Sequence, residues 1–129
     1  MKKICTHEGF DIYFQAQKEH TTLREHFVRE CGWSKEAYKN LKDTEPAWFC
    51  AHVVAKKEGV ILGEDYLGCC CYESVEEFYT KYFDDYFKSM ILNCIEQASK
   101  TLPKIIRGLE VKRDGLTKTI AALKESENV

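Results

Sequence analysis

The spacing of hydrophobic and polar residues divides the chain into extended and helical segments. Residues 10–16 are rich in aromatic and β-branched side chains and predict a first strand. Residues 48–55 predict a second strand, which a turn at residues 57–59 connects to a return strand. Gly63 and Gly68 interrupt the return strand, so we expect it to be kinked or bulged there. Together these segments predict a three-stranded antiparallel sheet.

Hydroxyl residues mark the predicted helix starts. Thr22 and Glu25 form a capping box that predicts a helix over about residues 23–31, and Ser34 begins a second short helix that ends before Pro46. A second capping box, Ser74 with Glu77, opens the longest predicted helix, from about residue 75 to residue 101. Pro103 suits the first turn of a final helix over about residues 103–124.

The apolar positions of the longest helix cover more than one narrow stripe, which is typical of a helix packed on two sides. We therefore expect an α+β fold in which a three-stranded antiparallel sheet packs against a long central helix. Two short N-terminal helices and a C-terminal helix complete it. The length of 129 residues indicates a single domain over residues 1–129.

Apolar residues recur along the final predicted helix with the spacing of a coiled-coil seam. Leucines occur every seven residues from Leu102 to Leu123, isoleucines fill the complementary positions, and Arg113 stands between them. The helix either pairs with a second copy or packs antiparallel on the long helix of its own chain, so the protein is a monomer or a homodimer. The candidate dimerisation residues are Ile106, Leu109, Leu116, Ile120 and Leu123.

Composition indicates a soluble protein of a reducing compartment. Hydrophobic residues make up 44% of the chain and charged residues 31%. No apolar run approaches the roughly 18–20 residues that a membrane span needs. Lys2 and Lys3 are not followed by the apolar stretch of a signal peptide. The seven cysteines are an odd number without a CxxC pair, so we expect reduced thiols and a cytoplasmic location, in the cytosol of a host cell.

Three consecutive cysteines raise the question of metal or thiol chemistry. Side chains alternate along a strand, so Cys69 and Cys71 share one face while Cys70 points to the other. A zinc site would need Cys50 and His52 from the neighbouring strand, and this spacing lacks the short-gap pairs of zinc sites. We therefore expect these thiols to fill space between sheet and helix, and we expect no metal and no cofactor.

No catalytic residue is predicted. A cysteine nucleophile would need a base, and none of the four histidines lies in a local catalytic signature. The glycines at positions 63 and 68 are followed by Cys69 where a phosphate-binding loop has lysine. The sequence thus favours a protein that is not an enzyme.

Charge is distributed unevenly along the chain. Residues 58–87 contain eight acidic residues and one lysine, whereas residues 1–57 and 88–129 carry small positive net charges. An acidic surface with tyrosines attracts partners that themselves bind nucleic acid. The candidate partner-binding residues are Glu64, Asp65, Tyr66, Glu73, Glu76, Glu77, Asp84 and Asp85.

Residues 48–68 followed by Cys71, Tyr72 and Ser74 carry the pattern WFxAxVxAxKxG…LGxDYLGxCxY. This pattern resembles small accessory proteins of phages and other mobile elements. More loosely, the two strands, their glycine turn and the acidic capped helix resemble modules of antirestriction proteins that mimic DNA. The resemblance implies an acidic surface that binds a host protein and carries no catalytic residues.

The leading hypothesis is a phage protein that inhibits a host nucleic-acid-targeting defence complex, as anti-CRISPR and antirestriction proteins do, by stoichiometric binding. Its partner would be a host defence protein or ribonucleoprotein complex, without contact to a membrane or directly to nucleic acid. One alternative is a dimeric nucleic-acid-binding regulator that uses the basic residues of the final helix. The other is a small metal- or thiol-dependent enzyme built on Cys50, His52, Cys69 and Cys71.

Overall fold

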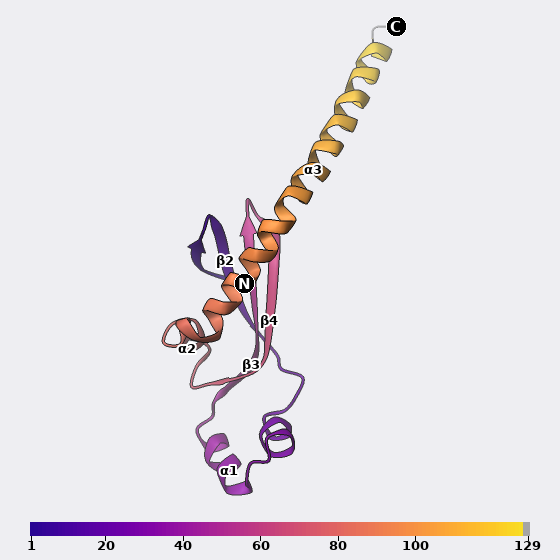
Figure 1. The fold of residues 1–129 in the computed structure, drawn as a ribbon. Coiled ribbons are helices and arrows are strands. Elements are labelled where there is room, and N and C mark those ends of the chain that lie inside the picture. Colours follow the sequence, from indigo (N-terminus) through magenta and orange to yellow (C-terminus); the bar gives the residue numbers. More distant parts are fainter. Residues whose placement is uncertain (128–129) are drawn as a thin grey trace.

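The fold is α+β, with an antiparallel sheet and a long C-terminal helix. In the computed structural model, which describes residues 1–127, four strands follow one another in the order β1-β2-β3-β4 (Figure 1). They are β1 (Lys2–His7), β2 (Phe10–Gln17), β3 (Ala47–Lys57) and β4 (Val60–Tyr72). The prediction of three strands was therefore wrong by one strand, β1.

The hydrophobic pattern misses β1 because only two of its six residues are apolar. The strand pairs with β2 through a turn in which Glu8 and Gly9 have φ angles of 50° and 82°. The β3–β4 turn is built the same way, with φ angles of 51° at Glu58 and 74° at Gly59. Positive φ at both central residues matches the right-handed twist of hairpin strands, so both turns set strand register.

The irregularities predicted for the return strand are confirmed. Pairing between β3 and β4 shifts once beside Gly63 and again where Gly68 and Cys69 lie opposite a single residue of β3. Cys69 has a φ of 58°, as expected for an extra residue accommodated in a bulge.

The two short helices near the N-terminus are confirmed, although the first is a π-helix. It is η1 (Glu25–Glu30). The hydroxyl of Thr22, which precedes η1, accepts a hydrogen bond of 3.1 Å from the amide of Glu25. The second is α1 (Lys35–Asp43), where the Ser34 hydroxyl accepts from the Ala37 amide at 3.1 Å. Both lie at the end of the sheet opposite the C-terminal end of the last helix (Figure 1).

The helices after β4 differ from the prediction. The prediction of one continuous helix over residues 75–101 was wrong, because α2 (Val75–Tyr79) and η2 (Phe83–Phe87) are separate short helices. Phe78 and Phe87 explain the break. Nine residues apart, they would point in opposite directions on one regular helix, yet both are fully buried in the same core with ring centroids 5.8 Å apart.

The prediction of a separate C-terminal helix that begins at Pro103 was also wrong. The last helix, α3 (Lys88–Glu127), is continuous for 40 residues and contains Pro103 in its interior. Its first half packs on the sheet, where Ile91, Cys94 and Ala98 are buried. Its second half leaves the folded body and extends away from it, so it does not pack back on its own chain (Figure 1).

The core lies between one face of the sheet and the helices α2, η2 and α3. Phe14, Phe49, Phe78 and Phe87 form its aromatic centre, with ring centroids 5.7–6.3 Å apart. No helix among residues 1–127 has both the length and the apolar composition of a membrane span.

Candidate functional site

The acidic residues predicted to form one surface lie in two separate groups. Glu64 and Asp65 are neighbours on β4, so their side chains point to opposite faces of the sheet. Glu64 Oε1 lies 3.2 Å from His52 Nε2 on the face away from the helices. Asp65 Oδ2 accepts a 3.0 Å hydrogen bond from Asn93 of α3.

The other five acids lie at the far end of β4, roughly 25–30 Å of extended chain away from Glu64. Glu73 precedes α2, which carries Glu76 and Glu77, while Asp84 and Asp85 belong to η2. We call residues 73–85 the acidic lobe. Its one basic residue is Lys81, whose pKa is raised by Tyr82 and, to a smaller degree, by Glu77 and Glu73. The eight predicted partner-binding residues therefore do not share a surface.

Tyr66, predicted as an aromatic anchor, instead supports a histidine. Its ring stacks on His52 with centroids 4.1 Å apart and planes within 6°. The His52 side chain is buried, and its Nδ1 lies 3.3 Å from the Gln17 amide nitrogen. Both ring nitrogens of His52 thus have protein partners, which makes it a structural residue of the sheet.

Of the three consecutive cysteines, only Cys70 belongs to the core, and the bulge at Cys69 interrupts the strand alternation on which the prediction of a shared face for Cys69 and Cys71 rested. Cys70 is buried on the helix side of the sheet, and burial raises its pKa to about 11. Cys69, Cys71 and Cys50 are half-buried, and burial raises the pKa of each thiol. Within residues 1–127, no three side chains of His, Cys, Asp or Glu are arranged to hold a metal ion.

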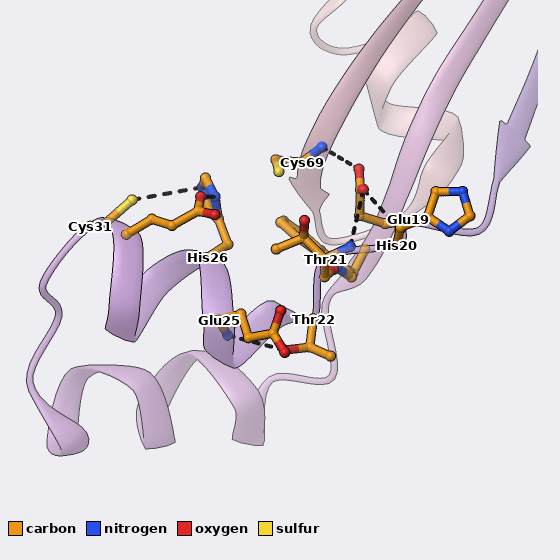
Figure 2. A network of polar contacts seen from close by, with 10 residues as sticks. Glu19, His20, Thr21, Thr22, Glu25, His26, Cys31 and Cys69 are labelled. Atoms are coloured by element: carbon orange, nitrogen blue, oxygen red, sulfur yellow. Dashed lines mark hydrogen bonds and ion pairs between the residues drawn. The ribbon is translucent and has the colours of Figure 1, made fainter.

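One polar cluster was missed from the sequence. On η1, Cys31 Sγ lies 3.8 Å from His26 Nε2, and His26 Nδ1 lies 3.0 Å from Glu30 Oε2 (Figure 2). The His26 ring thus contacts both the Glu30 carboxylate and the Cys31 thiol. Residues five apart meet here because the wide π-helical turn closes with a bond from the Cys31 amide to the His26 carbonyl. The sequence carries no clear signal for a π-helix.

A second missed contact ties the loop after β2 to the bulge of β4. The Glu19 carboxylate accepts from the backbone amides of Cys69 at 2.6 Å, His20 at 2.9 Å and Thr21 at 3.4 Å (Figure 2). These bonds, above all that from Cys69, lower the pKa of Glu19. Glu19 therefore holds the strained bulge and is structural.

The free half of α3 carries several exposed large apolar side chains. The five predicted dimerisation residues all lie on its outer part and all remain open to solvent. Their exposed fractions are 46% for Ile106, 57% for Leu109, 63% for Leu116, 51% for Ile120 and 65% for Leu123. They lie on one side of the helix, which continues the side that Ile91, Cys94 and Ala98 bury against the sheet. We call these five residues and Arg113 the α3 seam.

The inner end of the α3 seam borders an apolar pocket of about 430 Å³. One wall is the tip of the β3–β4 hairpin, with Val60 and Leu62 and the charged rim of Lys57 and Glu58. The other wall is α3, with Leu102, Ile105, Ile106 and Leu109. We call this space the hairpin-tip pocket.

The opposite side of α3 carries charges of both signs. By helical spacing, Lys104, Arg107 and Lys118 lie on it together with Asp114, Glu125 and Val111, which is 71% exposed. The free half of α3 is therefore amphipathic, with an apolar side and a charged side, which we call the basic side after its three cations.

The chain matches no protein-family model, no curated protein and no solved structure in comparisons with each. The resemblance of residues 48–74 to phage accessory proteins and DNA-mimic modules therefore stays a prediction.

Proposed function

We propose that this protein is a non-catalytic binding protein that acts as a homodimer joined through the α3 seam. The observation that carries this proposal is the set of five large apolar side chains at heptad spacing on α3. Their exposed fractions are 46–65%, and among the described residues nothing covers this side of the helix beyond Leu109. Contiguous exposed apolar surface of this kind marks interaction sites in soluble proteins.

A helix of this composition needs a partner to stay formed. Its free half, from residue 102 to residue 127, contains Gly108 and Gly115, each of which lowers helix stability by about 1 kcal/mol relative to alanine. Pro103 removes a further backbone hydrogen bond. Most helical stability in proteins comes from packing of an apolar face, and the apolar face of this half is exposed.

The seam is large enough for a reversible dimer. Burying the exposed part of each apolar side chain of the seam contributes about 1 kcal/mol, or about 10 kcal/mol for the ten apolar side chains of two copies. This is similar to the roughly 4–15 kcal/mol that association costs in lost freedom. We therefore expect dimerisation that depends on concentration.

Light scattering on matched variants tests the seam. Leu116→Glu places a charge in the seam, whereas Val111→Glu replaces a similarly exposed apolar residue on the basic side of the same helix. Leu116→Glu should give a monomer, and Val111→Glu should dimerise as the wild type does. Equal behaviour of the two variants would show that the seam does not join the subunits.

For the partner of this dimer, the acidic lobe supports the hypothesis of a phage protein that inhibits a host defence complex in the cytosol. The lobe presents Glu73, just before α2, and Glu76, Asp84 and Asp85, on α2 and η2, as exposed side chains. Glu73 and Glu77 also line a pocket of about 370 Å³ that contains Tyr82, so an aromatic group lies beside the carboxylates. A protein channel that binds nucleic acid has the complementary positive field.

Cleavage assays with a panel of bacterial restriction enzymes and RNA-guided nucleases test this partner class. Adding the protein should stop one of them at a stoichiometric ratio, and reversing Glu73, Glu77 and Asp85 to lysine should abolish the effect. A control with the same change in net charge reverses Glu36, Asp43 and Glu110, which are exposed elsewhere. Inhibition that survives the first set, or is lost equally with the second, would exclude the acidic lobe as the contact surface.

The basic side of α3 favours a second candidate, a dimeric nucleic-acid-binding regulator. Lys104, Arg107 and Lys118 would lie on the outside of the paired helices, within reach of phosphates. Binding to duplex DNA should then weaken steeply with salt, and glutamate at these three positions should abolish it. Affinity that is absent at low salt would exclude this candidate.

A further inference from the structure

The side of α3 that carries the seam also decides how two copies can be arranged. Up to Leu102 this side packs on the chain's own sheet, and the tip of the β3–β4 hairpin lies against Leu102, Ile105 and Ile106. Beyond Leu109 no other element of the described chain covers it (Figure 1). The sheet thus covers this side up to Leu102, the hairpin-tip pocket borders it from Leu102 to Leu109, and it is open beyond.

A parallel pair conflicts with this arrangement. Packed helices lie about 8–10 Å apart, and in a parallel pair the same residues of both helices meet. The first half of the second α3, with its attached sheet, would then occupy the space in which the first sheet already lies. A parallel pair would also place the two Arg113 guanidinium groups against each other in the middle of the seam.

An antiparallel pair removes both conflicts. The second helix runs towards the hairpin tip with its C-terminal end first, so its own body lies beyond the free end of the first helix. The free half of α3 is about 38 Å long at 1.5 Å per residue, which separates the two bodies. Arg113 then lies opposite Leu116 of the second copy, while its guanidinium keeps its contact with Asp114 at 3.3 Å.

The heptad spacing allows antiparallel registers seven residues apart, and we choose the one that pairs every residue of the α3 seam within residues 106–123. With Arg113 opposite Leu116, Leu109 lies opposite Ile120, and Ile106 lies opposite Leu123. Each contact occurs twice, because a two-fold axis pairs the same surface on both copies. Leu123 of one copy therefore lies at the hairpin-tip pocket of the other, where Ile106 and Leu109 form part of the wall.

We infer that two copies of this chain pair antiparallel through α3, with Leu123 of each copy filling the hairpin-tip pocket of the other. This inference rests on the proposed dimer. It adds the antiparallel orientation of the two helices and the contact of Leu123 with the hairpin-tip pocket. The pocket suits a leucine, since its walls are apolar side chains from both α3 and the hairpin. Lys57 and Glu58 leave a charged rim beside the place where Lys124 of the second copy follows Leu123.

Disulfide trapping tests the orientation. Ile106→Cys and Leu123→Cys are prepared as separate proteins, oxidised alone and as a mixture, and linked peptides are identified by mass spectrometry. Because all seven native cysteines remain, the wild-type protein treated in the same way gives the background. An antiparallel pair predicts a 106–123 link between chains that forms only in the mixture.

The possible outcomes distinguish a failure of the antiparallel arrangement from a failure of the proposed dimer. A 106–106 or 123–123 link in a single variant would show a parallel pair and overturn the antiparallel geometry while the dimer stands. Light scattering that shows a dimer, with no link at these positions, would also overturn the inference. A wild-type protein that stays monomeric at high concentration would overturn both.

The pocket contact has its own test. Val60→Glu places a charge in the wall of the hairpin-tip pocket, and Ile61→Glu changes a neighbouring exposed residue that does not line it. The antiparallel arrangement predicts that Val60→Glu raises the dimer dissociation constant by about tenfold or more, as expected for burying an unpaired charge, while Ile61→Glu has little effect. Equal effects of the two would exclude the pocket as a contact.

Discussion

Gly63 of β4 lies directly against the backbone carbonyl of Cys94 in α3, so closely that a Cβ atom on Gly63 would overlap that oxygen. This contact fixes the distance between the sheet and the buried half of α3. The Cys94 thiol makes a second contact between these layers, a 3.4 Å hydrogen bond to the Val53 carbonyl.

Gly63→Ala should therefore destabilise the protein by about 2–3 kcal/mol, because two backbone segments must separate to admit one methyl group. Gly108→Ala is the matched control, since it has open space around it in the free half of α3 and should stabilise that helix by about 1 kcal/mol. Urea denaturation measures both. A Gly63→Ala protein as stable as the wild type would contradict the packing of α3 on β4.

The lowered pKa of Glu19 predicts that the free energy of unfolding depends on pH. Its pKa is lowered in the folded protein by the Cys69 amide, so its contribution is present above its ordinary value of 4.5 and is lost as pH falls through the lower folded value. Glu19→Gln should lower the free energy of unfolding at neutral pH by about 1 kcal/mol or less, because solvent screens the site.

The difference between wild type and Glu19→Gln should shrink as the pH is lowered below 4.5. Denaturation curves at neutral and acidic pH measure it. A difference that is the same at both pH values would mean that the Glu19 charge does not support the bulge at Cys69.

Cys31 should be the first thiol to react with an alkylating reagent. It is exposed and lies beside His26, whereas burial raises the pKa of Cys5, Cys50, Cys69, Cys70, Cys71 and Cys94, the last to about 12. A time course with iodoacetamide at neutral pH, followed by peptide mass spectrometry, orders the seven thiols.

His26→Ala should slow the alkylation of Cys31 several-fold, because it removes the polar ring that lies 3.8 Å from the thiol. His20→Ala is the control, since His20 is exposed and makes no contact with this thiol. If His26→Ala leaves the rate unchanged, the contact in η1 does not activate Cys31.

The helix content should itself depend on concentration. The free half of α3 is stabilised by the second copy, so its turns should fray when the dimer dissociates. Circular dichroism of the wild type should show helical signal lost on dilution, while Leu116→Glu should have the lower signal at every concentration. A wild-type signal that does not change across the dissociation range would show that α3 stays helical without pairing.

Local patterns predicted β2, β3, β4 and the turn between the last two, because the signals lie within a few residues of the structure they specify, whereas β1 with few apolar residues was missed. Glycines at positions 59, 63 and 68 marked a turn and two bulges, and Ser34 marked a helix start. The helix break at residues 80–82 was not predictable in this way. It arises because Phe78 and Phe87 must reach the same core, which is a tertiary requirement.

The candidate surfaces were likewise predictable where they depend on local sequence and not predictable where they depend on tertiary structure. The heptad spacing identified the apolar side of α3, since helical periodicity is a local property. The acidic block did not become one surface, because adjacent residues on a strand face opposite ways and the long β4 separates Glu64 from the acidic lobe. The His26–Cys31 contact depends on a π-helical turn, and the sequence carries no clear signal for one.

The most direct test of the dimer is the molar mass of the wild-type protein in solution. Sedimentation equilibrium over a wide range of concentrations should show a mass that rises from 15.0 kDa for one chain to about twice that value, without larger species. A mass that stays at 15.0 kDa up to the highest soluble concentration would contradict a dimer formed through the α3 seam.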